Sequence, residues 1–70
     1  MEMTPVNSSN IEAIGYDPNS GTLIIQFKKG SIYEYYDVPQ YEYDSLMAAD
    51  SKGEYAHANI YKNYRQQKIA

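Results

Sequence analysis

The stretch that decides the fold is residues 22–36, which read TLIIQFKKGSIYEYY. Leu23, Ile25 and Phe27 stand two residues apart, the spacing that places side chains on one face of a β-strand. A turn containing glycine follows, and residues 31–36 return as a second run of β-branched and aromatic residues. The stretch therefore predicts an antiparallel hairpin whose first strand is central.

Working toward the N-terminus, residues 11–16 (IEAIGY) alternate like a further strand, and residues 17–21 (DPNSG) are nearly all turn formers. Residues 1–7 contain Pro5 and no periodic apolar pattern, so we expect a loose lead-in. Together these segments predict a three-stranded antiparallel meander.

Working toward the C-terminus, Val38-Pro39 should end the sheet, because proline lacks an amide donor and suits the first turn of a helix. Residues 40–49 and 54–67 then carry apolar residues at helical spacing, and residues 68–70 are expected to fray. The predicted fold is α+β, with a three-stranded antiparallel meander followed by two helices packed on one sheet face. Its predicted core is Ile11 or Ile14, Tyr16, Leu23, Ile25, Phe27, Leu46, Met47, Ile60 and Tyr64.

Length and composition predict a single domain over residues 1–70, with one small core. The chain has no cysteine, so no disulfide can supplement that core. Its longest apolar run is Leu23-Ile24-Ile25, which favours a cytoplasmic protein with no membrane segment. The net charge of −3 opposes simple electrostatic attachment to a polyanion, although residues 56–70 carry basic residues and no acid.

The order and spacing of these signals resemble the KTSC domain family, which also occurs at the C-terminus of some lysyl-tRNA synthetases. The matching residues are Val6, Ser8-Ser9, Ile14-Gly15-Tyr16-Asp17, Leu23, Phe27, Gly30, Tyr33-Glu34-Tyr35, Val38-Pro39, Ala49, Ser51, Gly53, Tyr55, Ile60 and Tyr64. Ala56-His57 depart from the pattern, in which an aromatic residue and Asn commonly follow Gly-x-Tyr. The resemblance implies a bacterial or phage origin and suggests RNA binding, but no reaction.

Tyrosine is the residue type most suggestive of function, with nine in 70 residues. Tyr33 and Tyr35 share a strand face, where they can stack on bases of RNA or single-stranded DNA while Lys28 and Lys29 contact phosphates. The alternative, which a chain with one Phe and no Trp favours, is that these rings pack under the helices. The sequence leaves open which sheet face the helices cover.

A protein partner is the other hypothesis, because tyrosine is enriched at interface cores. Free sheet edges would also permit self-association, and the sequence does not give the oligomeric state. The hydroxyls of Ser8 and Ser9 can contact a ligand, or they can satisfy backbone groups where the first strand begins.

The sequence does not predict an enzyme. His57 is the one histidine, and no serine has an evident base beside it. Glu42 and Asp44 are two apart on a predicted helix and point in different directions, which suits neither hydrolysis nor a metal. We therefore predict no catalytic residue, metal or cofactor.

Overall fold

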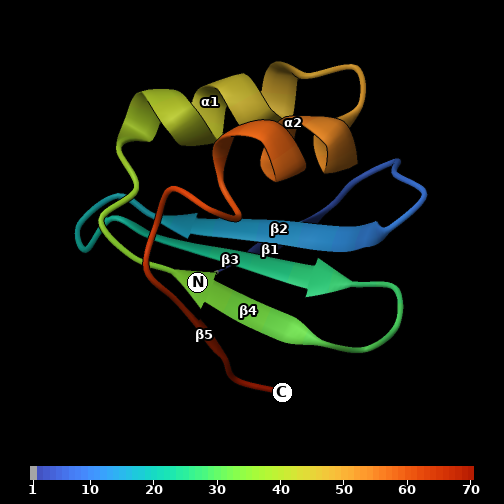
Figure 1. The fold of residues 1–70 in the computed structure, drawn as a ribbon, viewed down its shortest axis with the longest axis horizontal. Coiled ribbons are helices and arrows are strands. Elements are labelled where there is room, and N and C mark those ends of the chain that lie inside the picture. Colours follow the sequence, from blue (N-terminus) through green and yellow to red (C-terminus); the bar gives the residue numbers. More distant parts are fainter. Residues whose placement is uncertain (1) are drawn as a thin grey trace.

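The computed structural model describes residues 2–70 and shows a five-stranded antiparallel sheet with two helices on one of its faces (Figure 1). The strands are β1 (Met3–Pro5), β2 (Ile11–Asp17), β3 (Thr22–Phe27), β4 (Ile32–Tyr35) and β5 (Gln66–Lys68). The helices α1 (Gln40–Ala48) and α2 (Lys52–Asn59) lie between β4 and β5 in the chain. The α+β class is confirmed, whereas the three-stranded sheet is wrong because a strand is added at each edge.

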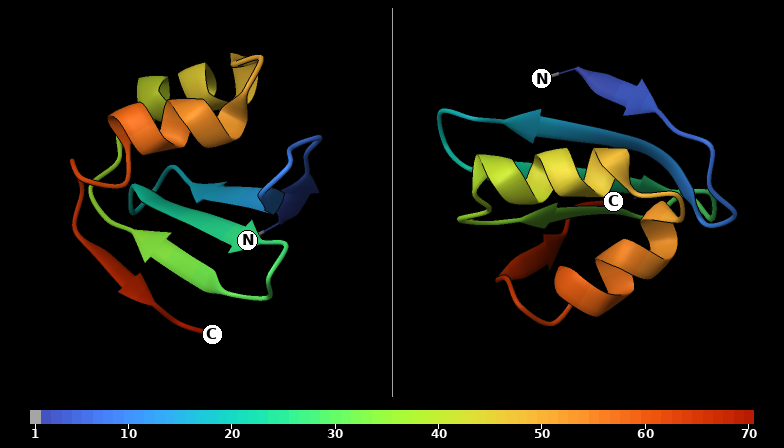
Figure 2. Two further views of the ribbon diagram at one scale, coloured as in Figure 1. Left: turned by 45° about the vertical axis from the view of Figure 1, so that its right-hand side comes forward. Right: turned by 90° about the horizontal axis from the view of Figure 1, so that it is seen from above.

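The first added strand, β1, lies within the predicted lead-in and pairs with β2, so that Thr4 stands opposite Ile14. Pro5 is tolerated there because an edge strand leaves one side of its backbone without a partner. Figure 2 shows β1 and β5 at opposite edges of the sheet.

The second added strand, β5, replaces the end of the predicted second helix. Helix α2 stops at Asn59, and Gln67 then pairs opposite Glu34 of β4. Residues 68–70, which we expected to fray, continue the pairing with β4, where the amide of Ile69 donates to the carbonyl of Ile32 over 2.8 Å. An exposed edge strand needs no apolar alternation, so its sequence gives little signal.

The helices cover the face of β3 that carries Leu23 and Ile25, both with no exposed surface. Strand β4 places Tyr35 opposite Leu23 and Tyr33 opposite Ile25, which puts both tyrosines on this helix-covered face. The fully buried members of the core are Ile11, Ile14, Leu23, Ile25, Tyr35, Val38, Leu46, Ala56 and Ile60. The other predicted core residues, Tyr16, Phe27, Met47 and Tyr64, are partly buried against it.

Both isoleucines of β2 are buried, although strict alternation would separate them. The pairing of β2 with β3 shifts between Ile11 and Ala13, so Ile11 lies opposite Phe27 while Ile14 lies opposite Ile25. An extra residue at such a bulge turns the following side chains to the other face. The bulge thus brings Ile11 and Ile14 onto the helix-covered face.

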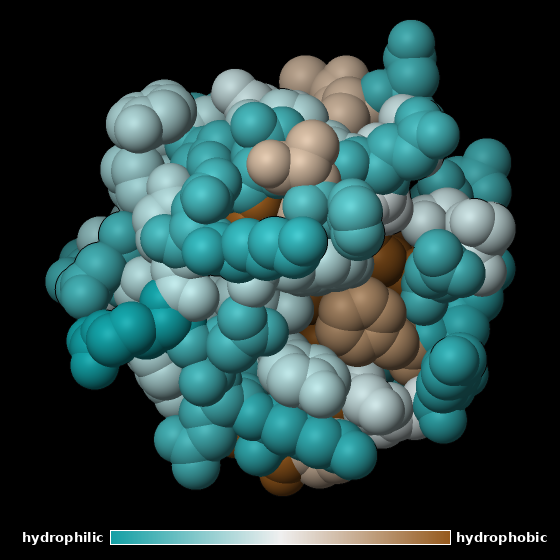
Figure 3. Space-filling model, in the orientation of Figure 1, coloured by the Kyte–Doolittle hydropathy of each residue, from teal (hydrophilic) through white to brown (hydrophobic). Residues whose placement is uncertain are grey.

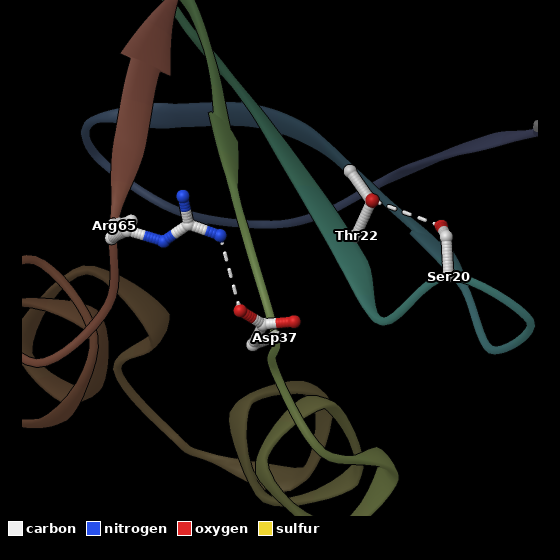
Figure 4. A network of polar contacts seen from close by, with 4 residues as sticks. All are labelled: Ser20, Thr22, Asp37 and Arg65. Carbon is white, nitrogen blue, oxygen red and sulfur yellow. Dashed lines mark hydrogen bonds and ion pairs between the residues drawn. The ribbon is translucent and has the colours of Figure 1, made fainter.

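The turn after β4 connects the sheet to both the β2–β3 loop and β5. Gly21 has a φ of +70°, and its carbonyl accepts from the amide of Val38 over 2.9 Å. Asp37 has a φ of +57°, and its carboxylate pairs with Arg65 over 3.2 Å (Figure 4). The Ser20 hydroxyl also donates to the Thr22 hydroxyl over 2.9 Å in this region. Because both charged side chains of the ion pair are exposed, it adds little stability.

A buried carboxylate joins the two helices. Glu42 of α1 is 8% exposed and accepts from the hydroxyls of Tyr55 and Tyr64, over 2.5 and 3.2 Å. The hydrogen bond that Tyr55 donates to Glu42 raises the pKa of Tyr55. The pKa of Tyr64 is raised to about 12, first by burial and then by the charge of Glu42. We call Glu42, Tyr55 and Tyr64 the helix cluster.

Candidate functional site

A groove of about 990 Å³ runs between the helix-covered face of the sheet and helix α2. Its walls come from the segment before β2, the β3–β4 hairpin, α2 and the start of β5. Figure 3 shows apolar residues, coloured brown, in a hollow below the helices, with hydrophilic residues around it. The residues that line the groove are Ser9, Asn10, Phe27, Lys28, Lys29, Ser31, Tyr33, Tyr35, Ser51, Gly53, Glu54, His57, Tyr61 and Gln66.

Four aromatic rings form one contiguous group in the groove. Tyr35 lies between Tyr33 and Tyr61, nearly parallel to both, with ring centroids 6.4 and 6.0 Å apart. Phe27 closes the group, at 5.9 Å from Tyr33 with perpendicular planes and at 6.0 Å from Tyr61. Separations in this range are favourable for aromatic pairs. We call Phe27, Tyr33, Tyr35 and Tyr61 the groove cluster.

The tyrosines of the groove cluster keep their hydroxyls free. Within residues 2–70, no hydrogen-bond partner is found for the hydroxyl of Tyr33, Tyr35 or Tyr61. Tyr35 is only 2% exposed, yet no fully buried side-chain oxygen in this part of the chain is unpaired. The Tyr35 hydroxyl therefore retains contact with solvent, and it does so in the groove. Burial raises the pKa of Tyr35, and the neighbouring Tyr61 and Tyr33 raise it further.

The hairpin end of the groove is polar and carries two cations. The amide of Lys28 donates to the carbonyl of Asn10 over 2.9 Å, which holds the start of the hairpin turn against the segment before β2. That segment also lies close to α2, since a Cβ added to Gly53 would be 3.8 Å from the side-chain nitrogen of Asn10. Glu54 is the one acidic residue among the lining residues, and Lys28 and Lys29 are the basic ones. This end of the groove has a local excess of positive charge.

The structure brings together five of the six residues that we predicted as a site: Ser9, Lys28, Lys29, Tyr33 and Tyr35. The sixth, Ser8, is not a lining residue, and its hydroxyl accepts from the amides of Asn10 and Ile11 over 3.3 Å each. Tyr35 cannot offer a ring face for stacking because it is buried between two other rings. Of the two alternatives left by the sequence, the structure agrees with the favoured one, because both rings lie on the helix-covered face, with Tyr33 partly buried and Tyr35 buried.

Sequence reasoning missed Tyr61, His57 and Gln66 as site residues. Tyr61 was placed on a long second helix, but the chain leaves α2 at Asn59 and Tyr61 then reaches the rings of the sheet. His57 is exposed on α2 with its ring edge-on to Tyr61, 6.3 Å between centroids. No local pattern links Tyr61 to Phe27, because the two residues are 34 apart in the chain and meet only in the folded domain.

Residues 2–70 contain neither a cluster of metal-ligating side chains nor a long apolar helix. No group of three His, Asp or Glu side chains is placed to hold a metal ion. Neither helix in this part of the chain is long and apolar enough to cross a membrane.

Comparisons with known proteins agree with this fold. The family model described as "KTSC domain" matches residues 7–64, which include every groove residue except Gln66. The chain belongs to the KTSC domain family. The crystal structure of a KTSC domain protein from Yersinia pestis is similar, with a TM-score of 0.93 and 38% identity over 99% of this chain and 97% of that one.

Two relatives show the contexts in which such domains occur. A protein of Tsukamurella paurometabola is 43% identical over 63 residues, which are 90% of this KTSC domain and 94% of the relative. A lysine–tRNA ligase of Nostoc is 39% identical over 62 residues, which are 89% of this chain but only 11% of the ligase. The KTSC fold thus occurs both in small proteins and as a minor part of a large enzyme, and the family description names no reaction.

Proposed function

We propose that this KTSC domain is a non-catalytic module that binds single-stranded nucleic acid in the groove. The observation that carries the proposal is that Lys28, Lys29 and Tyr33 line the same groove as Phe27 and Tyr61. Proteins that bind single strands combine aromatic rings, on which bases stack, with cations that follow the phosphates. The groove offers both kinds of group.

The charge distribution supports this choice despite the net charge of −3. Several acidic side chains are engaged away from the groove: Glu42 in the helix cluster, Asp37 with Arg65, and Glu34 with the Tyr36 hydroxyl. Lys28 and Lys29 are exposed, and neither forms an ion pair within residues 2–70. A local cationic region can attract phosphates on a molecule whose overall charge is negative.

The relatives add a weaker argument. Lysine–tRNA ligases of Nostoc and of Trichormus variabilis contain a segment similar to this chain, and the names of these enzymes include an RNA substrate. Attachment to such an enzyme is compatible with an RNA ligand, although it supports the proposal only by association.

Fluorescence anisotropy with labelled single-stranded RNA and DNA of about 8–12 nucleotides, a length matched to common single-strand sites, tests the proposal. We expect binding that weakens as salt rises, with a smaller salt slope in Lys28→Ala and Lys29→Ala, because each removes about one phosphate contact. Lys62→Ala is the matched control, since Lys62 is exposed and does not line the groove.

Absence of binding by the intact domain at low salt would overturn the proposal. Equal salt slopes in the groove and control variants would show that the nucleic acid binds outside the groove. In either case, a protein ligand for the groove becomes the better hypothesis, with self-association measured by sedimentation.

A further inference from the structure

The free hydroxyl of Tyr35 is unusual for so buried a side chain. Tyr35 is in the core and only 2% exposed, a position where phenylalanine would fill the same space without bringing a polar group. A fully buried polar group without a partner costs about 1–3 kcal/mol, and no side-chain oxygen of residues 2–70 is in that state. The Tyr35 hydroxyl has no partner among residues 2–70 but keeps contact with solvent in the groove, where a ligand can take the place of water. The tyrosine is thus placed to use its hydroxyl on something that enters the groove.

Two further hydroxyls lie near it. Tyr33 and Tyr61 flank Tyr35 with rings inclined by only 26° and 25° to its own, and all three line the groove. Each hydroxyl can donate one hydrogen bond and accept others. The groove cluster therefore has a set of adjustable donors and acceptors beside the partly buried rings of Phe27 and Tyr33.

We infer that the hydroxyls of Tyr33, Tyr35 and Tyr61 contact the hydrogen-bonding edge of a base, so that the domain discriminates between bases. This inference rests on the proposed function. Stacking alone tolerates every base, since each has a π-face. A site built to hydrogen-bond its ligand, in contrast, rejects ligands that leave its polar groups unpaired. Lys28 and Lys29 would contribute affinity without base preference, because phosphates are common to all nucleotides.

The experiment measures dissociation constants of the intact domain for single-stranded oligo-A, oligo-C and oligo-U of equal length. We expect one homopolymer to bind at least about fivefold more tightly than the weakest, the ratio that one neutral hydrogen bond provides. Tyr35→Phe keeps the ring and removes the hydroxyl, so it should reduce this ratio toward one without changing the salt slope. Tyr33→Phe and Tyr61→Phe should reduce the ratio by smaller factors, because these residues are less buried.

Tyr36→Phe is the matched control, because the Tyr36 hydroxyl donates to Glu34 and the residue does not line the groove. It should leave the base preference unchanged. The inference is overturned, and the proposed function kept, if the wild-type domain binds all homopolymers equally or if Tyr35→Phe keeps the full preference. If the wild-type domain binds no homopolymer, the proposed function is overturned and the inference with it. Circular dichroism of each variant establishes that it is folded.

Discussion

The helix cluster and the groove cluster both contain tyrosines on the helix-covered side of the sheet, but the tyrosine hydroxyls are paired in the first and unpaired in the second. Tyr55 and Tyr64 both donate to the buried carboxylate of Glu42. In the groove cluster, Tyr35 is more buried than either of them and has no partner. Burial alone thus does not decide which tyrosine hydroxyls are available to a ligand. Whether the hydroxyl is paired does, because a paired hydroxyl is not available to a ligand.

The largest effect that we expect is from Glu42→Ala, which leaves the hydroxyls of Tyr55 and Tyr64 without their shared acceptor. Hydrogen bonds to a charged group contribute about 1.5–3 kcal/mol, and a small cavity is also created, so the free energy of unfolding should fall by about 2–3 kcal/mol. Urea unfolding followed by circular dichroism measures the change. For a small domain this loss is a large share of the total stability.

Asp44→Ala is the control on the same helix, because Asp44 is exposed and accepts from Gln40 within α1. Its effect should stay within about 0.5 kcal/mol. Equal losses in the Glu42 and Asp44 variants would contradict the idea that the helix cluster holds the two helices together.

An alkaline titration should affect the helix cluster next most strongly. The pKa of Tyr64 is about 12 in the folded protein against 10.0 for the free side chain, so the folded state holds its proton more tightly than the unfolded state. The stabilisation of the folded state that comes from this raised pKa is complete below pH 10 and is lost as the pH rises from 10 to 12. Urea unfolding at several pH values measures it. Tyr64→Phe should make the decline shallower, and an unchanged decline would contradict this assignment.

The smallest effect on stability is expected from Tyr35→Phe, and it separates the two clusters most sharply. Because the Tyr35 hydroxyl has no partner among residues 2–70 and keeps contact with solvent, its removal should change the free energy of unfolding by less than about 0.5 kcal/mol. Tyr64→Phe, which breaks the hydrogen bond to the charged Glu42, should cost about 1.5 kcal/mol. A loss in Tyr35→Phe as large as that in Tyr64→Phe would show that the groove hydroxyl is structural.

The sequence predicted the central part of the fold well. Three strands and α1 each bury one face, and a buried face leaves an alternating or helical pattern of apolar residues in the sequence. The hairpin of β3 and β4 and the helix from Gln40 are where the pattern indicated. The edge strands were missed because the residues of β5 are all exposed and those of β1 are nearly so. The burial of Ile11 together with Ile14 depends on a bulge, a feature of pairing between strands that one strand's sequence does not contain.

The site was predicted in part for a similar reason. Lys28, Lys29, Tyr33 and Tyr35 are close in sequence, so local alternation was enough to group them. Tyr61 and Gln66 reach the groove only because the chain turns back after α2 and pairs with β4. The role of Glu42 could not be predicted from the local sequence, since the two hydroxyls that donate to it are 13 and 22 residues away in the chain.

The two edge strands also bear on how copies of this domain meet. Each is three residues long, β1 carries Pro5 at its end, and β5 is polar and ends at Lys68. Short edges, proline and lysine are the features by which β-proteins avoid pairing edge to edge and aggregating. The two edge strands therefore protect the sheet against edge-to-edge pairing and fibre growth.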